Sequence, residues 1–406
     1  MQNIHRLWSS PALVIIAGCL ICNIGYGVRS SFGLFLLPMT DSGGWDRETF
    51  ALAMAIQNLL WGVMMPVAGM IADRYGFALV IIGGTLVYAL GIWGMGISDS
   101  TAILYLTGGI LAGAGIAFTS FSLVATAMAR VVSPEKRSLI FGVGTAATSF
   151  GQFLFAPITQ FVIDGYGWAN GLVMLILSIS LVLPLAMFLP FTTNIKGESI
   201  ESQTIWAAIN EAIRHKGYIL LTLGFFVCGF HVAFIVIHYP AYITDLGFSP
   251  RVGGWTIAII GVFNILGAFL AGVYGQKGIK KNGLSFIYAA RAVVIALLLV
   301  LPKTELYLYI FAAAMGVLWL STVPLTNMVV AQIFGIRYLA TLYGFVFVSH
   351  QIGSFLGIWL GGLIYDRTGS YDGMWYAGII VGILAAIIHL PINEQPLGKS
   401  TVTERK

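Results

Sequence analysis

The sequence predicts an all-α membrane protein in which twelve transmembrane helices form two pseudo-symmetric six-helix bundles. Of its 406 residues, 58% are apolar and only 9% are charged, whereas a soluble domain carries about 25% charged residues. A membrane-spanning helix needs about 20 mostly apolar residues. Twelve such stretches follow one another along the chain, and a polar gap separates the first six from the last six.

The predicted spans set the domain boundaries. An N-terminal bundle, 1–191, contains candidate spans at 11–37, 49–72, 78–97, 101–129, 138–163 and 168–190. A C-terminal bundle, 218–406, contains candidates at 218–243, 252–275, 284–302, 305–334, 338–364 and 372–391. Within the polar central loop, 192–217, the segment from Gln203 to His215 could form a surface helix. The first span is longer than the h-region of a signal peptide, which measures about 7–15 residues, so we expect it to be retained.

The distribution of cations predicts the orientation in the membrane. Cytoplasmic loops carry an excess of Lys and Arg. With the N-terminus in the cytoplasm, 15 of the 21 Lys and Arg residues fall on the cytoplasmic side and 4 on the other. We therefore expect a multi-pass protein of the inner cell membrane with both termini and the central loop cytoplasmic. This topology accounts for the net charge of +5, so no nucleic-acid partner is expected, and we expect a monomer.

The two halves of the sequence repeat each other. Three pairs of residues are separated by 202 positions: Gly151 and Gly353, Asp164 and Asp366, Gly167 and Gly369. A half-length repeat with an even number of spans keeps both halves in the same orientation, and such halves are related by an axis along the membrane normal.

A short motif lies between the second and third spans. It reads Gly69-Met-Ile-Ala-Asp73-Arg74-Tyr-Gly76 and resembles the G-x-x-x-D-R-x-G signature of the major facilitator superfamily. This resemblance covers essentially the whole chain and implies the major facilitator fold, in which this loop helps to hold the outward-open state. Gly76 can supply a turn, and Asp73 can cap a helix or pair with Arg130. We expect these residues to form a gating loop.

Three further segments resemble one branch of that superfamily, the monocarboxylate transporters and oxalate/formate antiporters. They are Ser31–Phe35, Gly44–Arg47 and Tyr365–Gly369. Members of the branch move small carboxylates, and they usually carry an arginine on the eighth span and often a lysine on the eleventh. Here those spans offer Asn264 and His350 instead.

Charged groups inside spans are costly, and they are functional candidates by default. None of the 16 Asp and Glu residues falls deep in a predicted span, although export of cationic drugs by proton exchange generally uses a buried carboxylate. The deep cation is Arg29 in the first span. With no deep acid available, an anionic substrate is its expected partner; the alternative is that Arg29 snorkels to the surface. We expect Arg291 of the ninth span to snorkel, and the three cysteines, Cys228 among them, to be small apolar fillers.

Histidines and amides complete the candidate site. His231, His238 and His350 could carry a coupled proton near neutral pH, and His231 and His350 could also contact the substrate. The alternative is that each is neutral and hydrogen-bonded between helices. No spacing among them matches a metal-ligand motif. The amide candidates for the substrate site, which could equally serve as interhelical hydrogen-bonding groups, are Gln57, Asn58, Gln152, Asn264 and Gln351.

The leading hypothesis is a secondary transporter that moves a small, monocarboxylate-like organic anion by alternating access, with proton coupling as an open option. A multidrug or siderophore exporter of the same fold is the alternative. A sensor or scaffold that keeps the fold without transport is a third class. The chain lacks a phosphate-binding G-x-x-x-x-G-K-[ST] loop and a nucleophile–base pair, so neither ATP drive nor catalysis is expected, and no cofactor is expected.

Overall fold

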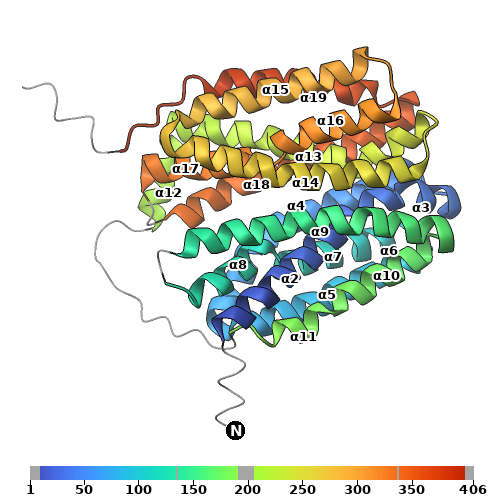
Figure 1. Cartoon of the computed structure of the whole chain (residues 1–406), viewed down its shortest axis with the longest axis horizontal. Coiled ribbons are helices and arrows are strands. Elements are labelled where there is room, and N and C mark those ends of the chain that lie inside the picture. Colours follow the sequence, from blue (N-terminus) through green and yellow to red (C-terminus); the bar gives the residue numbers. More distant parts are fainter. Residues whose placement is uncertain (1–9, 134–135, 191–204, 336–337, 398–406) are drawn as a thin grey trace, which may run out of the picture.

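The computed structural model describes residues 10–133, 136–190, 205–335 and 338–397, and this part of the chain is helical without strands. Twelve helical segments in it are long and apolar enough to cross a membrane. Figure 1 shows the N-terminal helices, coloured blue to green, beside the C-terminal helices, coloured yellow to red. The predicted fold class of twelve spans in two six-helix bundles is confirmed.

The N-terminal bundle contains six spans. Its elements are α2 (Pro11–Ser30), η1 (Phe32–Phe35), α3 (Leu36–Gly43), α4 (Arg47–Tyr75), α5 (Phe77–Gly96), α6 (Thr101–Leu104), the π-helical η2 (Tyr105–Leu111), α7 (Ala112–Phe118), α8 (Phe121–Arg130), α9 (Arg137–Tyr166), α10 (Trp168–Ser180) and α11 (Val182–Ala186).

The C-terminal bundle also contains six spans, preceded by the predicted surface helix. Its elements are α12 (Ile205–Arg214), α13 (Lys216–Asp245), α14 (Pro250–Lys277), α15 (Lys280–Val300), α16 (Glu305–Leu318), α17 (Thr322–Phe334), α18 (Leu339–Thr368) and α19 (Asp372–His389). Helix α12 occupies most of the segment in which a surface helix was expected.

The long helices begin and end where the local sequence favours it. The Asp46 side chain caps α4 by accepting a hydrogen bond from Thr49 N at 2.8 Å, and Pro250 begins α14 at a position where its missing N–H costs nothing. Gly76 separates α4 from α5 with φ of 94°, a conformation that favours glycine. The signature motif therefore forms a tight turn between two spans.

The helices of the fourth and tenth spans are each interrupted within the span. Between α7 and α8 the helix breaks at residues 119–120, and between α16 and α17 it breaks at residues 319–321. Thr119 and Ser321 are 202 positions apart, so the two breaks occupy equivalent places in the repeat. In the tenth span Pro324 follows the break, and its ring disfavours a continuous helix across the carbonyl four residues earlier.

The two halves meet along a seam in which α4 packs against α18 and α9 packs against α14; these helices lie side by side in Figure 1. The seam is tight towards the C-termini of α9 and α18, which we call the clasp end. A Cβ added at Gly362 would lie 2.7 Å from Arg47 O, and one at Gly254 would lie 3.0 Å from Gln160 Cβ.

The opposite end of the seam, which carries the signature motif and which we call the loop end, is open. Four glycines at this end lie a whole number of helical turns from residues of the same helix that contact the other half. They therefore face the seam. A Cβ added at any of these glycines would meet nothing within 4 Å: Gly69, Gly142, Gly272 and Gly344. The halves therefore touch at the clasp end and diverge at the loop end.

Candidate functional site

Arg29 lies on α2, where that helix faces the C-terminal half, and it is only half-buried. Its Nη2 donates a hydrogen bond to Asn58 Oδ1 at 2.7 Å. The guanidinium also lies 4.4 Å from the ring centroid of Trp61 and 5.5 Å from that of Tyr26. Its Nε is buried without a hydrogen-bond partner. Among the described residues no carboxylate pairs with it, so its hydrogen-bonding capacity is only partly used.

A small cavity borders Arg29 at the meeting of the two halves. Two amides of α4 line it together with apolar side chains of α13 and α18, and the full lining is Arg29, Gln57, Asn58, Ala233, Val236, Ile237 and Ile358. At about 10 Å³ the cavity has room for no more than one water in this state. One cation, two amides and an apolar wall are nevertheless the groups that a small anion with an apolar portion needs.

A chain of hydrogen bonds joins Arg29 to α18 of the other half. Gln351 Nε2 donates to Asn58 O at 2.8 Å, and the same amide's Oε1 lies 3.0 Å from His350 Nδ1. The His350 ring stacks on Phe347, with centroids 5.5 Å apart. The structure therefore brings four predicted site residues, Arg29, Asn58, His350 and Gln351, into one continuous group.

The remaining predicted amides hold other helix contacts. Gln57 borders the cavity, but its Nε2 donates to Gly108 O within the N-terminal bundle at 2.9 Å. Gln152 Nε2 donates to Ile257 O at 3.0 Å, which joins α9 to α14. Asn264 Nδ2 donates to Ser149 Oγ across the same contact at 2.8 Å. Gln152 and Asn264 thus lie in the part of the seam where α9 packs against α14, and they form no hydrogen bond with the Arg29 group.

His231 and His238 have surroundings that differ from that of His350. His231 is 2% exposed, and its Nε2 lies 2.8 Å from Gly378 O on α19, inside the C-terminal bundle. His238 is fully buried; its Nε2 lies 2.8 Å from Ile358 O and its Nδ1 lies 3.1 Å from the Tyr371 hydroxyl. Both histidines are hydrogen-bonded between helices, and the structure does not bring either into contact with Arg29.

The expectation that Arg291 snorkels is wrong, because the side chain is fully buried. Its Nη2 donates to Leu318 O at 2.6 Å and also to Trp319 O, and its Nε donates to Leu318 O at 3.1 Å. These carbonyls end α16 at the break in the tenth span, where no further helical N–H is available. Arg291 therefore caps the broken helix. Sequence reasoning missed this role because the break could not be located before the fold was known.

The interpretation of Cys228 as an apolar filler is also wrong. This thiol lies on α13 facing polar groups: its Sγ is 3.2 Å from Thr322 Oγ1 and 3.7 Å from Arg291 Nη2. Cys22, by contrast, is buried in the apolar core of the N-terminal bundle, as expected.

Ion pairs join the two halves at the clasp end. Arg47 of α4 makes two hydrogen bonds to Asp245 of α13, at 2.6 and 2.7 Å. Asp366 of α18 accepts from the backbone N–H groups of Arg47 at 3.2 Å and Glu48 at 2.6 Å, which caps α4 from the other half.

A second clasp occupies the equivalent position in the repeat. Arg251 Nε of α14 lies 3.0 Å from Asp164 Oδ2 of α9. Asp164 and Asp366 therefore each link the end of a fifth span to the start of a second span in the opposite half. The 202-residue repeat, which relates Asp164 to Asp366, is the sequence signal for this pair.

Tyr371 completes the first clasp. Its hydroxyl accepts a hydrogen bond from Arg47 Nη1 at 3.1 Å and lies 3.1 Å from His238 Nδ1. Burial raises the pKa of Tyr371 well above its ordinary value. The hydroxyl therefore stays protonated and can donate to His238.

The signature loop has the pairing that its sequence suggested. Arg130 Nη2 of α8 lies 2.7 Å from Asp73 Oδ1, and the Arg130 guanidinium lies 4.5 Å from the ring centroid of Phe77. Both charges are partly exposed. The loop is thus tied to the fourth span within its own half.

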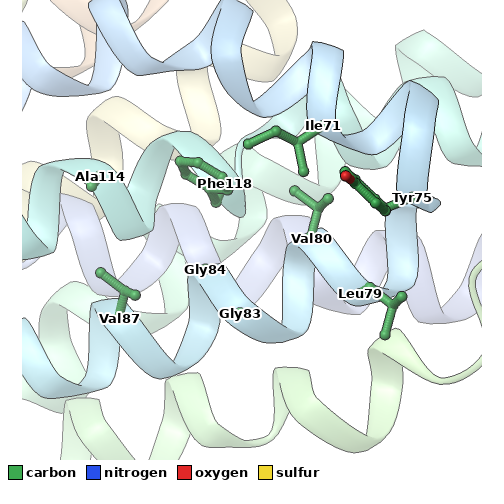
Figure 2. Close-up of a pocket in the computed structure, with 9 residues that line it drawn as sticks. All are labelled: Ile71, Tyr75, Leu79, Val80, Gly83, Gly84, Val87, Ala114 and Phe118. Carbon is green, nitrogen blue, oxygen red and sulfur yellow. The ribbon is translucent and has the colours of Figure 1, made fainter.

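A second, larger cavity is not the anion site. Figure 2 shows this groove of about 430 Å³ among α4, α5 and α7 of the N-terminal bundle. Apart from the Tyr75 hydroxyl its side chains are apolar, and its lining is Ile71, Tyr75, Leu79, Val80, Gly83, Gly84, Val87, Ala114 and Phe118. It contains no cation or amide, so it suits hydrocarbon and not a carboxylate.

Comparisons with known proteins agree with this architecture. The model of the Major Facilitator Superfamily matches residues 16–277 and 221–406. The chain is 26% identical to the oxalate:formate antiporter of Oxalobacter formigenes, over 88% of this chain and 85% of that protein. It is 24% identical to monocarboxylate transporter 13 of Rattus norvegicus, over 88% and 83%.

Solved structures share the fold. A bacterial homologue of the human lysosomal transporter Spinster, captured in an inward-facing and unoccupied conformation, superposes with a TM-score of 0.73 at 15% identity, covering 93% of this chain and 96% of that one. Twelve spans, the signature loop and the match to the family over most of the sequence lead to one conclusion: this chain is a transporter of the Major Facilitator Superfamily.

Proposed function

We propose that this protein is a monomeric secondary transporter that moves a small, monocarboxylate-like organic anion across the inner cell membrane by alternating access. Arg29 is the residue that binds the carboxylate. The observation that carries the proposal is the state of that side chain, a half-buried cation whose one side-chain hydrogen bond goes to a neutral amide at a cavity between the halves. The relatives named as monocarboxylate transporters and as an oxalate:formate antiporter support the same class of cargo.

Binding is expected to rearrange the Arg29 group. A carboxylate can take two parallel hydrogen bonds from a guanidinium, and it would compete with Asn58 Oδ1 for Nη2. The backbone carbonyl of Asn58 accepts the hydrogen bond from Gln351 across the seam. A change at Asn58 therefore reaches the other half directly, which couples occupancy of the site to the relative position of the halves.

The arrangement of the seam supports an inward-open state. The excess of cations assigns the loop end to the cytoplasm, and the seam is open at that end and closed at the clasp end. Alternating access then requires the Arg47–Asp245 and Arg251–Asp164 pairs to separate while the glycines of the loop end close on their partners.

Transport assays in proteoliposomes test the anion site. We expect uptake of labelled small monocarboxylates, and we expect Arg29→Gln to reduce uptake at least roughly tenfold, because a charge-assisted pair contributes more than about 1.4 kcal/mol. Arg367→Gln is the matched control, since Arg367 is an exposed cation at the clasp end. Equal transport by Arg29→Gln and wild type would refute the anion site. Export of cationic drugs without carboxylate transport would support the exporter alternative.

A matched pair of glycine substitutions tests alternating access. Gly362→Ala introduces a Cβ 2.7 Å from Arg47 O and should weaken closure of the clasp end, whereas Gly344→Ala has open space in this state. Spin labels at Gly142→Cys and Gly272→Cys, in a chain without its native cysteines, report the width of the loop end. We expect Gly362→Ala to shift the distance distribution to shorter values and Gly344→Ala to leave it long. The same distribution in both variants would contradict the inward-open assignment.

A further inference from the structure

Cys228 is a thiol surrounded by groups that stabilise negative charge. Thr322 and Arg291 approach its sulfur at 3.2 and 3.7 Å. At the next residue of α13, α18 packs so closely that a Cβ added to Gly229 would overlap His350 O, which brings this histidine near the sulfur. All four side chains are at most 6% exposed. A thiol is a weak hydrogen-bonding group, whereas hydrogen-bond donors and a nearby cation favour the thiolate.

Arg291 needs an anion that the described residues do not otherwise provide. A buried cation without a counter-charge is costly. The described carboxylates that form ion pairs lie at helix ends, with Arg47, Arg130 and Arg251. Arg291 Nη1 is buried without a partner. The phenols Tyr288 of α15 and Tyr343 of α18 also interact electrostatically with the sulfur. A Cys228 thiolate is therefore the counter-charge that this cluster can supply to Arg291.

The hydrogen bonds of His350 identify the ring nitrogen that can exchange a proton with the sulfur. Gln351 uses its Nε2 to donate to Asn58 O, so its Oε1 is the atom that faces His350 Nδ1 and accepts from it. In the neutral ring Nδ1 then carries the hydrogen, and Nε2 remains as the acceptor.

We propose that Cys228 and His350 together form a proton-binding site, in which Arg291 positions and stabilises the Cys228 thiolate. The inference rests on the transport function proposed above and adds to it the group that holds the coupled proton. A proton from water passes by way of His350 Nε2 to the sulfur, where an S–H bond forms. Release reverses this step, and no group is oxidised or reduced. The cluster gains one positive charge when it is protonated.

The same hydrogen bonds connect the proton site to the anion site. From the sulfur the path runs through His350 and Gln351 to Asn58, which is the partner of Arg29. Loading of the proton site can therefore alter the groups that bind the carboxylate. The thiolate takes the place of the deep carboxylate that the sequence lacks.

Infrared spectroscopy of purified protein tests the protonation state without any transport measurement. In a Cys19→Ser, Cys22→Ser background, Cys228 is the sole thiol. We expect its S–H stretching band to be weak at alkaline pH and to grow as the pH falls. In Arg291→Met the band should persist at every pH. If that variant does not fold, Thr322→Val serves instead. In that variant the S–H band should appear at a pH roughly one unit higher than in the parent. A full S–H band at every pH in the parent protein would overturn the proposal.

Transport assays then separate the proton site from the anion site. For each variant the pH-gradient-driven accumulation of a labelled monocarboxylate is divided by its counterflow exchange. Cys228→Ser carries a hydroxyl that does not ionise, so this ratio should fall on the order of tenfold. Cys22→Ser, a buried cysteine in an apolar setting, should keep the wild-type ratio. Absent counterflow in wild type would refute the proposed function. Intact counterflow with an unchanged ratio in Cys228→Ser would refute the proton site alone.

Discussion

Arg29 in the N-terminal half and Arg291 in the C-terminal half are both deep in membrane-spanning helices, yet they occupy opposite kinds of site. Arg29 is half-buried, has one neutral side-chain acceptor and lies beside a cavity. Arg291 is fully buried and donates to two carbonyls at the end of α16. The difference teaches that the partners of a membrane arginine, and not its depth, decide whether it is available to a ligand.

The largest expected effect comes from removing the two arginines in turn. Arg291→Met leaves buried carbonyls at the end of α16 without donors, and breaking such a buried charged contact costs about 3–5 kcal/mol of stability. Arg29→Met leaves a single neutral acceptor, Asn58 Oδ1, without its donor and should cost about 1 kcal/mol. Thermal unfolding of both variants in detergent gives the comparison. Equal losses of stability would show that Arg29 is structural too and would break the distinction.

A smaller effect is expected where arginines already have carboxylate partners, at the clasp end. The Arg47 side chain is 12% exposed and the Arg251 side chain is 70% exposed. Arg47→Gln should therefore shift the balance away from the inward-open state by about 1–2 kcal/mol. Arg251→Gln should shift it by less than about 1 kcal/mol, because water screens an exposed pair.

The alkylation rate of Gly344→Cys, in a chain without its native cysteines, measures this balance because the loop end closes as the clasp opens. We expect the rate to fall clearly with Arg47→Gln and only slightly with Arg251→Gln. The reverse order would mean that the exposure of the arginine does not predict the strength of its ion pair. The conclusion from Arg29 and Arg291 would then hold only for arginines inside the membrane.

Much of the fold could be predicted from hydropathy alone. Each span needs its own run of apolar residues, so the spans can be counted one by one, and the turn at Gly76 depends on local chemistry. The candidate site was less predictable. Arg29, Asn58, His350 and Gln351 proved to be neighbours, but Gln152 and His231 carry the same residue types and serve helix contacts elsewhere. A single sequence does not show which face of a helix meets the other half.

The sequence by itself determined the twelve spans, the repeat, the superfamily and the lack of a deep carboxylate, because these follow from composition, spacing and local motifs. Tertiary structure alone decided the roles of Arg291, Cys228 and the clasp residues Asp164 and Asp366. Each of those roles depends on a contact between residues far apart in the chain: Arg291 with a broken helix, Cys228 with that arginine, and each aspartate with the opposite half. Such contacts arise only when the packing of the helices brings the groups together.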